Sequence, residues 1–361
     1  MENLRIPGPT PCPPEVLQAM TKQMINHRGS EFSDMLAGVT ANLKTLFQTK
    51  NDLLCLSGSG TGGMEAAIVN MLSPGDKVLS VSCGVFGDRF ASIAQTFGAE
   101  VTSLKFDQGI AIDPKAVADA LQKNAGIKAV LVTHNETSTG ITNDLTSIAK
   151  IVKDHGKLLI VDAISSLGSI DLPVDKWNVD VAVSGSQKGW MAPPGLTMIA
   201  VSETAWKAHA ASKMPKFYWD FSRAKSYLGK GQTPWTPAIT VVYAMDVSLK
   251  MMLKEGMPNV FARHAKLGAM TRQGVKALGL KLLAKDERFA SNTVTAVWPP
   301  TDANPDDIRK VLRQEHKVVL SGGQGALEGK IFRIGHLGLC SEKDIQDTLD
   351  ALKKVLPKFG G

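Results

Sequence analysis

SGSQKGWMAPPG, residues 184–195, places one lysine between two short apolar stretches of the chain. Lys188 follows the apolar pattern of residues 180–184 and precedes a Pro-Pro-Gly turn, after which residues 196–201 are apolar again. A lysine at such a junction should be partly desolvated, which lowers the pKa of its amine and makes the amine nucleophilic. A solvated turn lysine is the ordinary alternative, so the surrounding sequence decides between the two.

Short apolar stretches alternate with helical patterns on the N-terminal side of this turn. Such alternation predicts an α/β fold with a mostly parallel sheet, helices on both of its faces, and a ligand site at the carboxyl ends of its strands. The stretches 180–184 and 196–201 are joined too closely for a parallel crossover, so we expect them to pair antiparallel or to lie in different layers. The other predicted strands cover residues 53–56, 77–82, 100–106, 128–133 and 157–162.

The C-terminal third has the pattern of a smaller α+β domain. A long helix is predicted over residues 243–278, and shorter strands and helices follow it. The stretch 213–237 is rich in aromatic residues, Pro and Gly and is expected to be irregular, whereas the proline-rich start of the chain should be extended. Because 361 residues exceed one ordinary core, we predict an arm (1–15), a large domain (16–255) and a small domain (256–361).

Composition narrows the possible partners and the compartment. The net charge is +7, but the 41 basic and 34 acidic residues form no dense basic block, which favours small anions and argues against nucleic acid. Cys12, Cys55, Cys83 and Cys340 stand far apart, so neither a metal site nor a disulfide scaffold is expected. No stretch resembles a signal peptide or a membrane span, so we expect a cytoplasmic protein with no membrane partner.

A glycine-rich loop, SGSGTGG at residues 57–63, follows the predicted strand 53–56 and precedes a helical pattern that begins at Met64. Such a loop can present backbone N–H groups and the positive end of a helix dipole to a phosphate. The loop matches neither the Walker A pattern nor the dinucleotide-binding fingerprint. Taken alone, it is either a phosphate site or a flexible turn.

Four ordered segments of the chain resemble the fold-type I pyridoxal-phosphate (PLP) enzymes of class V, in particular the alanine/serine–glyoxylate aminotransferases. The resemblance extends from Pro7 to Gly335. It implies a PLP cofactor, a homodimer with shared active sites, and the transfer of an amino group to a 2-oxo acid. The segments are SGSGTGGMEAAIVNML (57–72), THNETSTG (133–140), LLIVDAISSLGS (158–169) and SGSQKGWMAPPG (184–195).

The resemblance assigns the two catalytic roles to Lys188 and Asp162. Lys188 would form the Schiff base with the cofactor and then move the substrate α-proton as general base and acid. Asp162 would pair with the pyridine nitrogen and keep it protonated, so that the ring can accept electrons. Without the lysine nearby, Asp162 could simply be a helix cap.

The resemblance also implies which residues bind the cofactor. Thr137 and Gln187 would contact the ring of the cofactor, and Phe86 would stack on it where relatives carry tryptophan, although an ordinary core aromatic is the alternative for Phe86. Two threonines of the neighbouring subunit would complete the phosphate site. Some relatives have a tyrosine in place of one of them, Thr233. The predicted phosphate ligands are Ser59, Gly60 and Thr61 of one subunit with Thr233 and Thr236 of the other.

For the substrate, the resemblance implies that Arg333 holds the α-carboxylate through its planar guanidinium, although a salt bridge to a surface acid is the alternative. His27 and Arg28 would border the pocket, unless they belong to a solvated turn. No second arginine clamp is evident in the sequence, so alanine or serine is the expected donor, and glyoxylate or pyruvate the acceptor. Aspartate or 2-aminoethylphosphonate transamination, cysteine desulfuration and a non-catalytic subunit are the alternatives.

Overall fold

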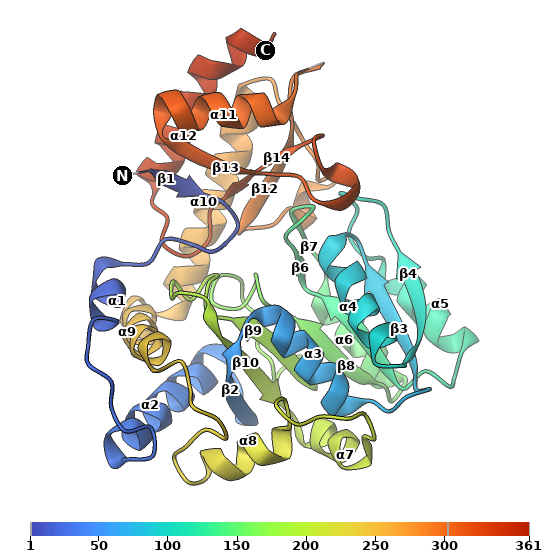
Figure 1. Cartoon of the computed structure of the whole chain (residues 1–361). Helices are drawn as coiled ribbons and strands as arrows, with labels where there is room; N and C mark the ends of the chain where they lie inside the picture. The colour runs from blue at the N-terminus through green and yellow to red at the C-terminus, as the bar shows by residue number, and fades with distance from the viewer. Residues whose placement is uncertain (1, 302, 361) are drawn as a thin grey trace.

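The computed structural model describes residues 2–301 and 303–360. Two sheets organise this part of the chain, a larger one in the lower half of Figure 1 and a smaller one in the upper half. The larger sheet has the strand order β2, β10, β9, β8, β5, β3, β4. Its strands are β2 (Asp52–Gly58), β3 (Lys77–Ser82), β4 (Glu100–Lys105), β5 (Ala129–Thr133), β8 (Leu158–Asp162), β9 (Val181–Gly185) and β10 (Gly195–Val201).

The larger sheet is parallel except for β10, which pairs antiparallel with both β9 and β2. The antiparallel pairing of β9 with β10 confirms the expectation from their short connection. Since β2, β3, β5, β8 and β9 run in the same direction, their carboxyl ends meet along one edge of the sheet. The predicted α/β class and the mostly parallel sheet are therefore confirmed.

Helices cover both faces of this sheet and bury its central strands, whose side chains are apolar on both sides. On β5, Val130 and Val132 face one hydrophobic core, while Ala129 and Leu131 face the other. One core includes residues of α3 (Gly60–Met71), α4 (Val85–Thr96), α7 (Glu203–Ala211) and α8 (Phe221–Leu228). The other core includes residues of α1 (Pro14–Ala19), α2 (Ser30–Phe47), α5 (Pro114–Lys123), α6 (Leu145–Asp154) and α9 (Ile239–Glu255).

The smaller sheet has the strand order β1, β13, β14, β12, β11, and β1 comes from the N-terminal arm. The arm is extended as expected, and its strand pairs parallel with β13. Which residues belong to the arm, the large domain and the small domain stays a prediction. The elements of the smaller part are β1 (Asn3–Arg5), α10 (Met257–Ala277), β11 (Lys281–Leu282), β12 (Val294–Trp298), α11 (Pro305–His316), β13 (Val318–Gly322), β14 (Phe332–Gly335) and α12 (Glu342–Val355).

Three local predictions were wrong. The single helix expected over 243–278 is two helices, α9 and α10, because the chain turns at Gly256 with φ of 82°. The stretch 213–237 is not wholly irregular, since Asp220 caps the helix α8 within it. The helix after the glycine-rich loop begins at Gly60 and not at Met64, because the Ser59 side chain caps it. No helix of the described residues is long and apolar enough to cross a membrane.

Candidate active site

A cavity lies at the carboxyl-end edge of the larger sheet, where the ends of β2, β8 and β9 meet the start of α4. It brings together nearly all the residues that the sequence assigned to cofactor binding and catalysis. Arg89 and Ser165 also line it, and neither was predicted. The lining residues are Ser59, Gly60, Thr61, Met64, Phe86, Arg89, Thr137, Asp162, Ile164, Ser165, Gln187 and Lys188.

Lys188 lies in the turn that follows β9, and its amine points to the N-terminal arm. Nζ donates a hydrogen bond of 2.5 Å to the carbonyl oxygen of Pro7. Burial, with a smaller contribution from the positive charge of Arg333, lowers the pKa of Lys188 to about 8 despite the opposing effect of Asp162. Compared with a solvated lysine, a much larger fraction of this amine is unprotonated and nucleophilic near neutral pH.

The turn that carries Lys188 is held in place by its own polar groups. The Ser186 hydroxyl donates to the Pro193 carbonyl at 2.6 Å, and the backbone N–H of Met191 donates to the Lys188 carbonyl at 3.1 Å. Trp190 is fully buried and donates from Nε1 to Ser184 Oγ at 2.8 Å. The Ser, Trp and Pro residues around the lysine therefore fix its backbone, which leaves only the side chain free to move.

Asp162 ends β8 and is buried, with 4% of its surface exposed. Oδ1 accepts a hydrogen bond of 2.9 Å from the backbone N–H of Ile164. Burial is the largest influence on the carboxyl and raises the pKa of Asp162 to about 7, although Lys188 and Arg89 pull the pKa down. A buried carboxylate with one protein donor is poised to pair with a cationic group in the cavity, because such a partner would offset its desolvation.

The glycine-rich loop forms the first turn of α3 at one end of the cavity. Ser59 Oγ accepts from the Gly62 backbone N–H at 3.4 Å, and the Ser59 carbonyl accepts from the Gly63 N–H at 3.1 Å. The N–H groups of Gly60 and Thr61 in the same turn can therefore bind an anion. Ser59 and Thr61 are exposed, whereas Gly60 is buried. These positions fit the predicted phosphate site, but the contacts of all three residues with a phosphate stay a prediction.

Phe86 lies on the first turn of α4 and lines the cavity as predicted. The Arg89 guanidinium carbon lies 4.7 Å from the centroid of the Phe86 ring, and Nη1 donates to Thr61 Oγ1 at 3.3 Å. No carboxylate within salt-bridge distance of Arg89 is found among the described residues. The sequence did contain a signal, since residues three apart on a helix share a face and Arg89 follows Phe86 at that spacing.

Thr137 and Gln187 both line the cavity. The Thr137 hydroxyl donates to Ser165 Oγ at 2.7 Å, and Ser165 in turn donates to the Asn135 carbonyl at 2.9 Å. Gln187 Oε1 is buried and has no hydrogen-bond partner in the described part of the chain. An unpaired buried oxygen is costly, so a hydrogen-bond donor on a bound group would stabilise this side of the cavity.

Arg333 on β14 does not line the cavity, but from the smaller sheet it contacts the lining residue Thr137. Nε donates to the Gly322 carbonyl at 2.8 Å, and Nη1 donates to the Thr137 carbonyl at 3.0 Å and to Gln324 Oε1 at 3.2 Å. Burial lowers the pKa of Arg333 to about 10, so the guanidinium stays charged at neutral pH. Its partners are neutral oxygens and not a surface carboxylate, which leaves the charge available to an anion beside the cavity.

Glu136 supports the site from beneath and was not singled out in the sequence. Its buried carboxylate accepts hydrogen bonds from the backbone N–H groups of Phe86 (3.1 Å), Gly87 (3.0 Å) and Ser138 (3.0 Å), and from the Ser138 hydroxyl (2.6 Å). Burial raises the pKa of Glu136 against the effect of these donors. Glu136 therefore caps α4 from a different element and fixes the position of Phe86.

Besides Arg333, four predicted residues do not line the cavity of this chain, namely His27, Arg28, Thr233 and Thr236. Exposed Arg28 donates to the carbonyl oxygen of Thr233 at 2.7 Å and lies over the ring of Tyr227. The Thr233 hydroxyl donates to the Trp235 carbonyl at 2.7 Å, and Thr236 is exposed. Arg28 and Thr233 thus contact each other near the surface, although they lie far apart in sequence. His27 precedes Arg28 in the chain. Their roles in binding substrate or the partner's cofactor stay predictions.

The cavity residues fit a phosphorylated pyridine aldehyde. A nucleophilic amine (Lys188), an acidic group (Asp162), an aromatic face (Phe86), an unpaired acceptor (Gln187) and a free helix N-terminus line the same space. Each matches one part of such a molecule by charge or hydrogen-bonding type. In the described ranges, no group of three or more His, Cys, Asp and Glu side chains is placed to hold a metal ion.

Comparisons with known proteins agree with this site. The fold is that of the fold-type I aminotransferases, since the crystal structure of pyridoxamine–pyruvate aminotransferase from Mesorhizobium loti superimposes with a TM-score of 0.95. That enzyme is 32% identical, and the match covers 99% of this chain and 92% of the other. A family model described as aminotransferase class-V matches residues 3–337. The chain belongs to the class-V aminotransferase family.

Two curated relatives carry different kinds of name. The soluble hydrogenase 42 kDa subunit of Anabaena cylindrica is 46% identical over 360 residues, covering 99% of this chain and 94% of that protein. The serine–glyoxylate aminotransferase of Methylorubrum extorquens is 37% identical over 350 residues, covering 94% of this chain and 87% of that protein.

Proposed function

We propose that the protein is a PLP-dependent aminotransferase that moves an amino group from a small amino acid to a 2-oxo acid. The observation that carries this proposal is that Lys188 and Asp162 line one cavity, while the Arg333 guanidinium binds the carbonyl of the cavity residue Thr137 and lowers the pKa of Lys188. A scaffold without activity has no need for a buried carboxylate and a buried lysine amine in the same cavity, since both are costly to desolvate.

Each of these three residues has a separate task. When PLP is bound, it supplies an electron-accepting ring and an aldehyde. Lys188 Nζ would hold the cofactor at its aldehyde carbon, with loss of water, and once free it would take up and return the substrate α-proton. Asp162 holds a proton on the ring nitrogen, and Arg333 orients the substrate by its α-carboxylate. Phe86 and Gln187 fix the plane of the ring.

For the substrate pair we propose alanine or serine as donor and glyoxylate or pyruvate as acceptor. The name of the Methylorubrum extorquens relative supports serine and glyoxylate. A donor with an uncharged side chain also suits the apolar part of the cavity lining, which is Met64, Ile164 and Phe86.

Arg89 favours a second candidate, an acidic donor such as aspartate. The expectation of a small neutral donor depended on the absence of a second arginine clamp. Arg89 lines the cavity and has no carboxylate partner among the described residues, so it is such an arginine in addition to Arg333. Its guanidinium could bind the distal carboxylate of aspartate or a phosphonate. Replacing Arg89 with glutamine should then lower kcat/KM for L-aspartate by about 10²-fold and leave L-alanine nearly unchanged.

Two rivals from other classes receive less support. A cysteine desulfurase needs a reactive thiol near the lysine, but Cys340 is buried and burial raises the pKa of its thiol to about 11. A non-catalytic subunit is suggested by the name of the Anabaena cylindrica relative. The retained site argues for activity, and a cytoplasmic location stays a prediction from the sequence.

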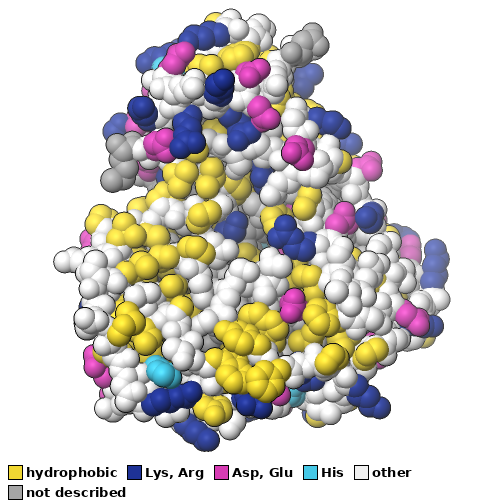
Figure 2. Space-filling view, in the orientation of Figure 1, with side chains coloured by type: hydrophobic (Ala, Val, Ile, Leu, Met, Phe, Trp, Pro, Cys, Tyr) yellow, Lys and Arg dark blue, Asp and Glu magenta, His cyan; other side chains and the backbone are white. Residues whose placement is uncertain are grey.

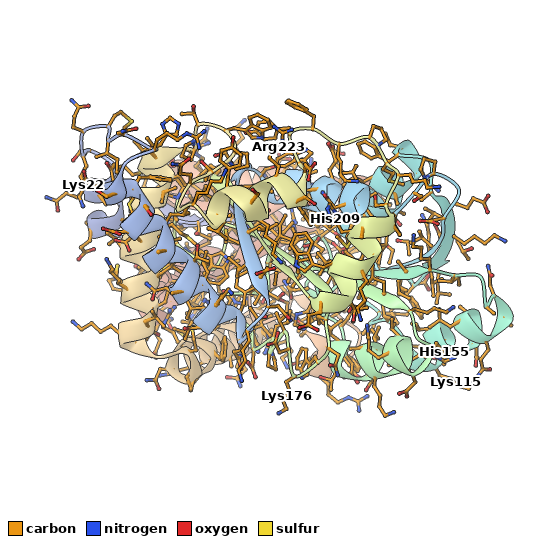
Figure 3. All side chains as sticks on the ribbon, turned by 90° about the horizontal axis from the view of Figure 1, so that it is seen from below. Lys22, Lys115, His155, Lys176, His209 and Arg223 are labelled. Carbon is orange, nitrogen blue, oxygen red and sulfur yellow. The ribbon has the colours of Figure 1, made fainter. Side chains whose placement is uncertain are left out.

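The proposed homodimer is supported by an exposed aromatic surface beside the glycine-rich loop. Hydrophobic side chains gather on the lower face in Figure 2, where α8 and the segment before it lie in Figure 1. Phe217 is 67% exposed and stacks on Trp235, and Arg223, labelled in Figure 3, lies over both rings. Such an exposed apolar cluster next to an incomplete anion site suits a second copy of the chain.

Subunit mixing tests this dimer. Lys188→Ala and Thr236→Asp should each be inactive, but co-refolding the two should restore about a quarter of the wild-type activity, because a mixed dimer has one site free of both changes. Refolded single variants serve as controls. No recovery in a mixture that forms dimers would show that the two residues act in the same chain.

The first experiment on the function is the visible spectrum of the protein reconstituted with PLP, recorded before and after L-alanine, L-serine or L-aspartate is added singly. Loss of the lysine-bound cofactor band on adding a donor, and its return on adding glyoxylate, would support transamination and rank the donors. A protein that binds PLP at Lys188 but responds to no donor would contradict the proposed reaction. A protein that never binds PLP would favour the non-catalytic reading.

A further inference from the structure

The N-terminal arm contacts Lys188 directly. The Pro7 carbonyl accepts the 2.5 Å hydrogen bond from Nζ, and Gly8 lies so close that an added Cβ would be 2.6 Å from the same nitrogen. Thr10 continues the contact, because its N–H donates to the Gln187 carbonyl at 3.0 Å and its hydroxyl donates to the Lys188 carbonyl at 2.9 Å. The arm therefore binds both the backbone and the amine of the lysine.

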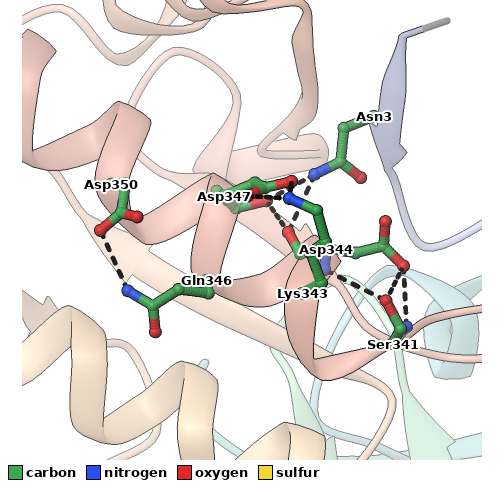
Figure 4. A network of polar contacts seen from close by, with 8 residues as sticks. Asn3, Ser341, Lys343, Asp344, Gln346, Asp347 and Asp350 are labelled. Atoms are coloured by element: carbon green, nitrogen blue, oxygen red, sulfur yellow. Dashed lines mark hydrogen bonds and ion pairs between the residues drawn. The ribbon is translucent and has the colours of Figure 1, made fainter.

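The same arm is anchored in the smaller sheet. Residues Asn3–Arg5 pair with β13, and Asn3 Nδ2 donates to the Asp344 carbonyl at 2.8 Å and to Thr348 Oγ1 at 3.2 Å at the start of α12 (Figure 4). Ser341 and Asp344 form a capping box there, which fixes this end of α12. The arm is therefore anchored to the smaller sheet and to α12, whereas Lys188 follows a strand of the larger sheet.

The connection between anchor and lysine passes along β14, the strand that carries Arg333. Gly335, two residues beyond Arg333 on β14, lies against the arm, and a Cβ there would be 2.3 Å from the Ile6 carbonyl oxygen. At Gly338, φ is +71° and a Cβ would approach Thr10 Oγ1 at 3.1 Å and the Lys188 carbonyl at 3.2 Å. The strand that carries the predicted substrate clamp and the turn that carries the lysine thus contact the same few residues of the arm.

We propose that residues 6–10 are a positioning segment, which covers the Lys188 amine and holds it at the Pro7 carbonyl whenever that amine is not bonded to a carbon atom. The inference rests on the proposed role of Lys188. A carbonyl oxygen can only accept, so it binds the amine as a donor and keeps it beside the cavity while a substrate occupies the cavity. Because the segment is attached to β13 and packs on β14, movement of the smaller sheet would move this hydrogen bond.

Competitive acetylation of the ligand-free protein tests this proposal without the cofactor. The acetylation of Lys188 is followed against pH by peptide mass spectrometry, with a free amino acid as internal standard. The charged groups that act on this amine are Asp162 on β8, Arg333 on β14 and Arg89 on α4, and all three stay unchanged in the variants. A failure of the protein to bind PLP would not affect this measurement, so the two proposals can fail separately.

Gly8→Ala should displace the arm and expose the amine. Burial is the main reason why the pKa of Lys188 is low, so we expect its acetylation midpoint to rise by about 1 pH unit toward the ordinary lysine value. Gly279→Ala is the matched control, since Gly279 also has a positive φ but a Cβ there meets nothing within 4 Å. An unchanged midpoint in folded Gly8→Ala protein would contradict the proposal that residues 6–10 shield the Lys188 amine from solvent.

The carbonyl itself can be tested without any steric change. Cys12 allows a synthetic peptide of residues 1–11, activated as a prolyl selenoester, to be ligated to a chain that begins at Cys12. Glycolic acid in place of Gly8 turns the Pro7 carbonyl into an ester, which is a weaker acceptor while the cover remains. We expect the midpoint to fall by about 0.5 unit, because a weaker acceptor stabilises the ammonium less. A midpoint equal to that of the all-amide ligated protein would overturn the proposal, even if Gly8→Ala does not fold.

Discussion

The two ends of the candidate active site differ in how completely one chain builds them. At the lysine end, Asp162 and Arg333 are buried, and the main-chain groups around them are paired by hydrogen bonds. At the glycine-loop end, Ser59 and Thr61 are exposed. The same chain thus buries the groups expected to carry out the chemistry, but leaves the predicted anion site exposed to solvent.

The difference follows from where the residues lie in the fold. Asp162 ends a central strand, and Lys188 follows the neighbouring strand, so helices on both faces of the sheet bury that end. The glycine-rich loop follows β2, an edge strand, where no further strand covers it. Burial can therefore shift the pKa values of Asp162 and Lys188 at the lysine end. The glycine-rich loop would be shielded from solvent only by a partner subunit or a ligand.

The largest effect is expected when the lysine end loses its nucleophile. Lys188→Ala should lower the rate of transamination by at least about 10³-fold, since no other lysine lines the cavity. Single-turnover mixing with L-serine measures this loss, and circular dichroism checks the fold. Lys115→Ala is the control, because Lys115, labelled in Figure 3, is exposed on α5 and does not line the cavity. Normal turnover by Lys188→Ala would remove the lysine from the chemistry.

The next effect concerns the carboxylate clamp. Arg333→Lys keeps the charge but loses the planar fork, so KM should rise by about 10²-fold for the donor and for the acceptor alike, because both present an α-carboxylate. Steady-state kinetics with each substrate varied in turn measures the two KM values. Arg309→Lys serves as control, since Arg309 pairs with Asp306 on α11. A change confined to one of the two substrates would contradict a shared clamp.

The third prediction concerns the pH dependence of stability. The pKa of Asp162 is raised from its ordinary 3.8 to about 7, so the stability associated with its protonated form is present at low pH and lost as pH rises through about 7. Asp162→Asn should therefore stabilise the ligand-free protein by on the order of 2 kcal/mol more at pH 8 than at pH 5. Urea unfolding at both pH values tests this.

The control for this measurement is Asp154→Asn, whose carboxylate is largely exposed. Bound PLP should also reduce the pH dependence of the wild type, because a protonated ring nitrogen beside Asp162 compensates the buried charge. Equal pH dependence in wild type and Asp162→Asn would show that this carboxylate is solvated in the ligand-free protein.

The lysine end was also the end that the sequence predicted best. Apolar strand patterns that alternate with helical patterns along the chain predict a parallel sheet. A parallel sheet places the residues that follow its strands at one edge. Asp162 and Lys188 are such residues, so pattern alone placed them at that edge and the resemblance gave them roles. The turn at Gly256 was not predicted, because helically spaced apolar residues continue on both sides of it, in α9 and in α10.

What the sequence could not reveal depends on contacts between distant segments. The Pro7 carbonyl has no side-chain signature, and a buried Glu136 cannot be told from an exposed one by its neighbours in sequence. The resemblance placed Arg28 near the pocket, which stays a prediction, but nothing in the sequence indicated its contact with the Thr233 carbonyl. Such contacts between residues far apart in sequence appear only when the backbone has been placed.

The smallest effect should come from the glycine-loop end. Ser59→Ala removes the cap of α3 and one hydroxyl of the predicted phosphate site, so it should lower the free energy of unfolding by about 1 kcal/mol and weaken PLP binding about 5-fold. Ser202→Ala is matched to it, because Ser202 caps α7 in the same way, accepting from Ala205 N at 3.0 Å, but does not line the cavity. Both variants should lose similar stability, and only Ser59→Ala should lose affinity for PLP. Equal affinities in the two variants would mean that Ser59 acts only as a helix cap, and that the phosphate is held by backbone N–H groups and by the second subunit.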